Sequence, residues 1–160
     1  MLKYFFLLLF GTSVLPGFAQ GALTQPLLPT INLTLTNGES FTQPQLKQGP
    51  VILVYFSPDC GHCKQFITDL LQREKLIKDR QVILATFVEL NTLKSFEETM
   101  GLRKFPNMRV GTEGKGYALV RALDIRKFPF VALYDSSRRL VKSFEGEQPF
   151  NEIADAIRKL

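Results

Sequence analysis

The stretch "SPDCGHCKQF", residues 57–66, holds the only two cysteines and the only histidine of this 160-residue chain. It follows "PVILVYF", residues 50–56, an uninterrupted apolar and β-branched run that is typical of a strand covered on both faces. Directly after the cysteines, Phe66, Ile67 and Leu70 recur at helical spacing. The sequence therefore predicts that the cysteines lie where a buried strand passes into a helix.

This position predicts a reactive pair. Free N–H groups and the positive end of the helix dipole stabilise a thiolate at the start of a helix. A C-x-x-C pair at this position is known to lower the thiol pKa. Cys60 is expected to point outward and Cys63 to face back toward it, so that a disulfide can close without backbone rearrangement. His62, when protonated, favours the thiolate of Cys60. Asp59 either opposes that thiolate or serves as the helix N-cap.

Two other roles for the cysteines are possible from the sequence. A structural bridge would close a very small loop and stabilise the fold little. A metal site needs three or four ligands, and with one histidine already inside the motif only Met, Asp or Glu could complete it. The pattern favours redox chemistry, with no metal and no cofactor beyond Cys60 and Cys63.

The composition is that of an ordinary globular domain, with 45% hydrophobic and 22% charged residues. The formal net charge is +5, but no run of Lys and Arg exceeds two residues. A solvated basic surface is therefore favoured over a nucleic-acid-binding stripe.

The N-terminus has the three-part layout of a secretory signal. Lys3 precedes an apolar run over residues 4–10, and small residues follow near Ala19. The run is broken before it reaches the length of about 18 residues that a membrane span needs. We expect a cleaved leader at residues 1–20, a flexible lead-in at 21–29 and one domain at 30–160. Export, most simply to a periplasm, follows; membrane contact would require an uncleaved leader.

The remaining elements alternate between strands and helices, which predicts an α/β fold with a mixed sheet. Asn37-Gly38 marks a hairpin turn. The expected elements are a hairpin at 31–42, the strand at 50–57, a helix to residue 79, a strand at 81–90, helices at 91–102 and 117–125, a hairpin at 130–146 and a helix at 148–160, with residues 103–116 as a loop.

Three segments of the chain resemble the thioredoxin superfamily: "VILVYFSPDCGHCK", "DIRKFPFVALYD" and "RLVKSFEG". The extra helix at 91–102 and the segment that precedes the first motif are similar to those of the TlpA-like and redoxin branch of exported thiol–disulfide oxidoreductases. The resemblance covers about residues 30–160. It implies a thioredoxin-like three-layer fold, with a central mixed β-sheet flanked by helices and a helical insertion in the core.

The resemblance also assigns roles to the site residues. It implies that Cys60 is the exposed nucleophile and Cys63 the buried resolving thiol. Pro129 would follow a cis peptide bond beside the pair, and the backbone of Phe128 would pair with an extended substrate segment. The implied partners are client proteins with disulfides or thiols and a membrane redox partner, with no nucleic acid. Reduction of clients is favoured over oxidation or isomerisation.

The chain departs from the family pattern in two respects. A buried acidic residue that serves many thioredoxins as a proton relay is replaced by Val54, and Glu89 is the one nearby substitute, unless it is simply an exposed strand-end residue. The usual tryptophan before the first cysteine is replaced by Asp59. CGHC is the pattern of disulfide isomerases and indicates a less reducing couple. A non-catalytic binding module and a metallochaperone stay open as alternative functions.

Overall fold

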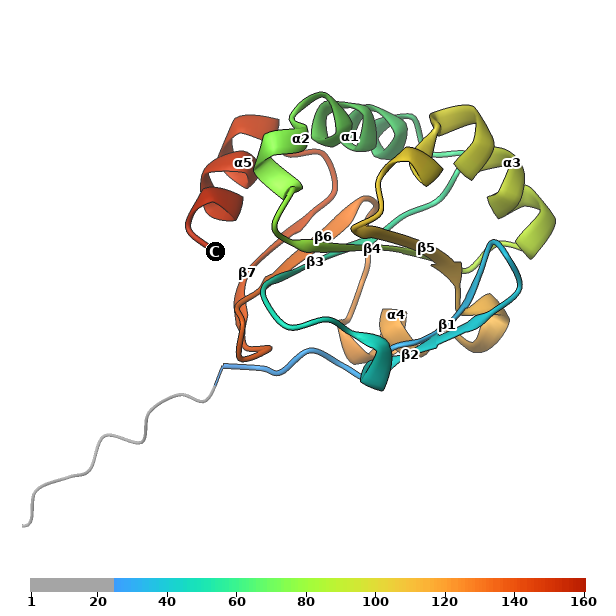
Figure 1. The fold of residues 1–160 in the computed structure, drawn as a ribbon, viewed down its shortest axis with the longest axis horizontal. Coiled ribbons are helices and arrows are strands. Elements are labelled where there is room, and N and C mark those ends of the chain that lie inside the picture. Colours follow the sequence, from blue (N-terminus) through green and yellow to red (C-terminus); the bar gives the residue numbers. More distant parts are fainter. Residues whose placement is uncertain (1–24) are drawn as a thin grey trace, which may run out of the picture.

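Strand β3 (Val51–Tyr55), which leads to the cysteines, lies inside a seven-stranded sheet in the computed structural model, which describes residues 25–160 (Figure 1). All five of its residues are buried, which confirms a strand covered on both faces. The predicted leader at residues 1–20 lies outside the described residues. The strands follow the order β2 (Ser40–Thr42), β1 (Asn32–Leu35), β5 (Met108–Thr112), β4 (Gln81–Thr86), β3, β6 (Phe130–Tyr134), β7 (Leu140–Glu145).

The sheet is mixed and forms the middle of three layers, as expected. β3 pairs parallel with β4 and antiparallel with β6. One face is covered by α1 (Gly61–Gln72), α2 (Glu74–Ile77), α3 (Leu90–Met100) and α5 (Phe150–Arg158). The short helix α4 (Ala118–Ala122) and the segment around Leu28 and Ile31 cover the other face (Figure 1). Because side chains of β3 alternate between these two cores, both faces need apolar residues.

The helix expected to run to residue 79 is broken at Arg73, where φ is −110° and ψ is 49°. The break separates α1 from the single turn of α2, whose Ile77 is fully buried. The guanidinium of Arg73 lies 4.5 Å from the centre of the Phe150 ring on α5. The prediction of one continuous helix was wrong because this tertiary contact and the burial of Ile77 redirect the chain.

The loop predicted for residues 103–116 contains strand β5, which pairs parallel with β4 and antiparallel with β1. Gly111 of β5 allows β1 to approach closely. A Cβ at this position would lie 2.9 Å from Leu33 Cβ and 3.2 Å from the Thr34 carbonyl oxygen. A glycine within a strand often marks such a close backbone approach. The segment was misassigned because its strand character depends on pairing with neighbours that are distant in sequence.

Other boundaries differ by a few residues. β4 ends at Thr86, and α3 begins at Leu90 with Glu89 as its N-cap, one residue before the predicted helix start at 91. Gly101, with φ at 65°, ends α3. α4 covers only part of the predicted helix at 117–125. The two hairpins, β1–β2 and β6–β7, and the final helix α5 are confirmed.

The described part of the expected lead-in is held against the β6–β7 turn. Leu27 forms a β-bridge with Arg139, and the amide of Leu28 donates to the Arg138 carbonyl at 2.9 Å. Leu28 itself is buried. Residues 26–28 therefore belong to the folded domain and are not a flexible segment. Among residues 25–160 there is no helix with the length and apolar character needed to cross a membrane.

Candidate active site

The two cysteines lie at the start of α1, as predicted. Cys60 is the N-cap of this helix, and the backbone N–H of Cys63 donates to Cys60 Sγ at 3.2 Å. Asp59 is exposed and precedes the cap, so the expectation that it serves as the N-cap was wrong. The extended conformation of Cys60, with φ at −81° and ψ at 115°, turns its sulfur toward the free N–H groups of the first helical turn.

The two sulfurs have very different environments. Cys60 is half-buried, whereas Cys63, in the first turn of α1, is fully buried. Burial raises the pKa of the Cys63 thiol well above its usual range, and the neighbouring Cys60 sulfur adds to the effect. The first turn of α1 contains no acidic residue that would oppose a negative charge on Cys60. The arrangement therefore offers one sulfur that is reachable from solvent, with a buried thiol behind it.

A proline borders the same site. The peptide bond between Phe128 and Pro129 is cis, as the resemblance implies, and Pro129 is buried. Pro129 and His62 line one pocket of about 110 Å³, although they are far apart in sequence. The structure thus brings together the C-x-x-C turn and the proline predicted to lie beside it.

His62 faces a residue that sequence reasoning missed. Its Nδ1 lies 3.5 Å from Glu147 Oε2, and the two side chains are 62% and 75% exposed. Glu147 follows β7 in the connection to α5. No sequence pattern marks this glutamate, because only the fold brings the connection to the cysteine turn.

Glu89, the proposed proton relay, is exposed at the N-cap of α3. No hydrogen bond joins its side chain to Cys63 among the described residues. Val54 is fully buried in β3, at the position where the family pattern expects an acid. The structure therefore gives the relay role of Glu89 no contact that would support it.

Phe128 rests on an aromatic cluster that also reaches β3. Its ring centre lies 5.8 Å from that of Tyr55 and 5.9 Å from that of Phe87. The Tyr55 hydroxyl donates to Glu113 Oε1 at 2.6 Å, and Glu113 Oε2 accepts the Leu119 N–H at 2.8 Å. Burial, together with this carboxylate, raises the pKa of Tyr55 above its usual range. The half-buried ring of Phe128, next to the cis bond, therefore packs against Tyr55 and Phe87.

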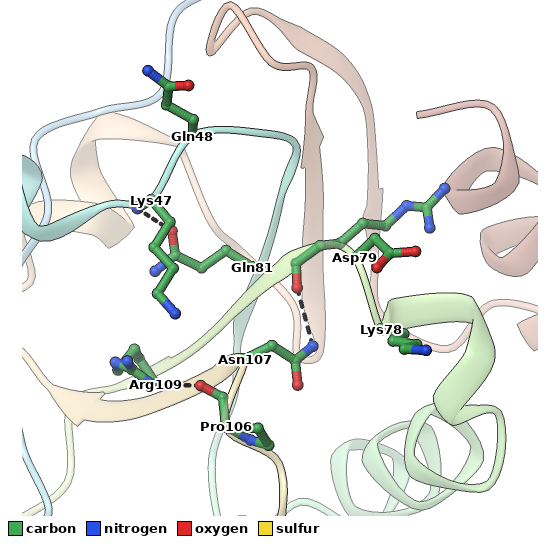
Figure 2. A pocket seen from close by; sticks show the side chains of 9 residues that line it. Lys47, Gln48, Lys78, Asp79, Gln81, Pro106, Asn107 and Arg109 are labelled. Atoms are coloured by element: carbon green, nitrogen blue, oxygen red, sulfur yellow. Dashed lines mark hydrogen bonds between the residues drawn. The ribbon is translucent and has the colours of Figure 1, made fainter.

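A second pocket, of about 220 Å³, lies at the opposite end of the sheet, where β4 and β5 begin (Figure 2). Lys47, Lys78 and Arg109 line it together with Asp79, and the backbone N–H of Lys47 donates to the Gln81 side chain. Basic residues that are scattered in the sequence therefore meet here. Neither cysteine is near this pocket, so it does not belong to the thiol site.

The described residues contain no group of three or more His, Cys, Asp or Glu side chains placed to hold a metal ion.

Comparison with protein families and solved structures defines the class of this site. The family described as "Thioredoxin-like domain" matches residues 38–160. The chain belongs to this thioredoxin-like family, and the spacing of Cys60 and Cys63 fits a C-x-x-C motif. Comparison with the sequences of curated proteins gave no match.

Several solved structures share the fold. A secreted disulfide oxidoreductase of Mycobacterium tuberculosis, homologous to Escherichia coli DsbE, has a TM-score of 0.68 at 14% identity, over 81% of this chain and 96% of that one. An exposed lipoprotein thioredoxin of Streptococcus pneumoniae has a TM-score of 0.59 at 17% identity, over 82% and 100%. The peroxidoxin BcpB of M. tuberculosis has a TM-score of 0.67 at 13% identity, over 86% and 97%. At these identities the likeness establishes the fold alone.

Proposed function

We propose that this chain is exported and reduces disulfide bonds in client proteins through Cys60 and Cys63. The observation that carries the proposal is the unequal burial of the two sulfurs, one reachable from solvent and one enclosed. A client can approach only Cys60, while Cys63 is held for the second step. The leader pattern at residues 1–20 supports export to the periplasm. Two structural neighbours, one a secreted protein and one an exposed lipoprotein, point the same way.

The reaction is a pair of thiol–disulfide exchanges. The Cys60 thiolate attacks one sulfur of a client disulfide, the client S–S bond breaks, and the released client thiolate takes up a proton. A mixed disulfide now joins Cys60 to the client. Cys63 then loses its proton and attacks Cys60 Sγ, which breaks the mixed disulfide and releases the second client thiolate. The client gains two electrons, and the protein ends with a Cys60–Cys63 disulfide.

The second exchange needs a base to accept the proton of Cys63. With Val54 at the expected acid position and Glu89 exposed, the departing client thiolate or water accepts it. No cofactor beyond the two cysteines takes part. A dithiol donor, which we propose is a membrane redox partner, restores the reduced pair by the same chemistry in reverse.

The residues beside the C-x-x-C turn support the substrate class. Pro129 has no backbone N–H because its ring closes on the nitrogen, and it lies next to the half-buried Phe128. An extended client segment that carries a cysteine can lie along these two residues and place its sulfur at Cys60. Phe128 and Pro129 are therefore proposed to line the client groove, with His62 and Asp59 modulating the charge around Cys60.

The test is to trap the mixed disulfide. The Cys63→Ser variant, incubated with a disulfide-containing protein such as insulin, should accumulate a covalent adduct through Cys60 that dithiothreitol releases. Cys60→Ser is the matched control and should form none. A non-catalytic binding module would give no adduct in either variant. Equal adduct formation by both variants would refute the assignment of Cys60 as the attacking sulfur.

A further inference from the structure

The pocket beside the cysteine turn has an apolar floor and an acidic rim. Its volume is about 110 Å³, enough for one side chain. The floor includes Phe66 of α1 and Phe150 of α5, whose ring centres lie 5.7 Å apart. His62 and Pro129 form the side nearest the reactive sulfurs, and Glu147 stands at the rim.

The charge of the rim is only partly balanced. Glu147 is 75% exposed and has one ionic partner among the described residues, His62, which carries charge only when protonated. Asp69, with 27% exposure, accepts a 3.3 Å hydrogen bond from Gln65 Nε2 and lies 3.9 Å from Arg73 Nη1. That separation is long for a charge-assisted hydrogen bond. Two carboxylates therefore face this pocket, in a chain whose net charge is +5.

Such a pocket suits a long cationic side chain. Lysine and arginine bury their methylene stems along apolar surface while their charged heads remain at the edge. The two tilted aromatic rings of the floor and the carboxylates of the rim provide both contacts. An anionic side chain would be repelled by Glu147 and Asp69, and a short neutral one would leave the floor unfilled.

We propose that this pocket binds a lysine or arginine of the client beside the cysteine under attack, so that the enzyme prefers clients with a cation at that place. This inference rests on the proposed function, because it names the substrate class of the same site. Glu147 supplies the main contact, and Asp69 adds to the field. Cys60 performs the chemistry regardless of the residue in the pocket, and the pocket selects which disulfide is presented to it.

The experiment uses two disulfide-linked peptides that differ only by Arg or Gln next to the target cysteine. The reduced full chain is mixed with each at low ionic strength and about pH 8, where thiolate attack is efficient. We expect the rate constant for the Arg peptide to exceed that for the Gln peptide about threefold to fivefold, as suits a partly exposed ion pair. The ratio should fall toward one at about 0.5 M salt.

Three variants assign the preference to the pocket. In Glu147→Gln the Arg-to-Gln ratio should drop close to one, and in Glu147→Lys a peptide with Glu at the same place should become the better substrate. Glu152→Gln is the matched control, since Glu152 is an exposed glutamate of α5 that does not line this pocket, and its ratio should equal that of the unaltered chain.

The outcomes separate the two proposals. Failure of the unaltered chain to reduce either peptide would refute the proposed function itself. Equal reduction of both peptides by that chain would leave the oxidoreductase in place and overturn the cation pocket. A preference for Arg that survives in Glu147→Lys would also overturn it, because the selecting charge would then lie elsewhere.

Discussion

The hydroxyl of Tyr55 donates a 2.6 Å hydrogen bond to Glu113, and this bond joins the strand that leads to Cys60 to the segment that leads to Pro129. Tyr55 is the last residue of β3, and Glu113 follows β5. The second carboxylate oxygen of Glu113 holds the Leu119 N–H at the start of α4. One side chain thus connects three segments around the ring of Phe128, which the structure places directly against Tyr55.

Two fully buried tyrosines offer a direct measure of this bond. We expect Tyr55→Phe to lower the free energy of unfolding by about 1.5–3 kcal/mol, because it removes a hydrogen bond to a carboxylate. Tyr134 is equally buried, but its hydroxyl has no hydrogen-bond partner among the described residues. Tyr134→Phe should therefore be neutral or slightly stabilising. Urea unfolding followed by circular dichroism measures both, and equal losses would contradict the role given to Glu113.

The close approach of β1 to β5 leads to a prediction about Gly111. A Cβ there would lie 2.9 Å from Leu33 Cβ and 3.2 Å from a backbone oxygen, so Gly111→Ala must push β1 away. We expect a loss of about 1–3 kcal/mol in the free energy of unfolding, as for other overpacked sites. Gly116→Ala is the control, because a Cβ at that position meets no atom within 4 Å. Thermal unfolding would disprove the explanation if both variants melted alike.

The raised pKa of the Cys63 thiol predicts how the second exchange depends on pH. Burial, its main cause, persists when Cys60 is occupied by a client. The thiolate fraction of Cys63 should then increase about tenfold per pH unit from neutral into the alkaline range, and release of the client should follow it. Stopped-flow release of a coloured thiol attached to Cys60 measures this rate. A rate that stays flat over that interval would show that Cys63 ionises readily.

Stability should decline in alkali. Burial raises the pKa of Tyr134 from 10.0 to about 12. Below pH 10 the tyrosine is protonated in both states, but above it the unfolded chain releases the proton first, so stability is lost as the pH rises through the folded-state pKa. A shift of this size corresponds to about 2–3 kcal/mol. The urea midpoint of unfolding, measured below pH 10 and again near pH 12, should fall less in Tyr134→Phe than in the unaltered chain. An equal fall in both proteins would rule Tyr134 out as the cause.

Local signals made the centre of the fold predictable. The apolar run of β3, the break at Pro58 and the helical spacing from Phe66 onward identify a strand, a turn and a helix without reference to the rest of the chain. The resemblance then supplied the cis bond before Pro129, which no local pattern shows. Each of these features depends on residues adjacent in sequence or on a motif already known.

The features that were missed depend on contacts between distant segments. β5 is a strand because Gly111 allows β1 to pair beside it, and α1 stops before Arg73, whose guanidinium packs on Phe150 of the neighbouring helix. Glu113 and Glu147 look like ordinary surface glutamates in the sequence. Their roles follow from the packing of Tyr55 and the position of His62, which only the folded chain defines.

The pairing of residues 26–28 determines which end of the sheet this segment occupies. Residues 26–28 pair with the β6–β7 turn, and the pairing of Tyr134 with Val51 puts that turn at the end of the sheet where β3 starts. The cysteine turn lies beyond the other end of β3, roughly 15 Å farther along the strand direction. Residues 26–28 and the cysteine turn therefore lie at opposite ends of the sheet, so a client that reaches Cys60 approaches the end away from this segment.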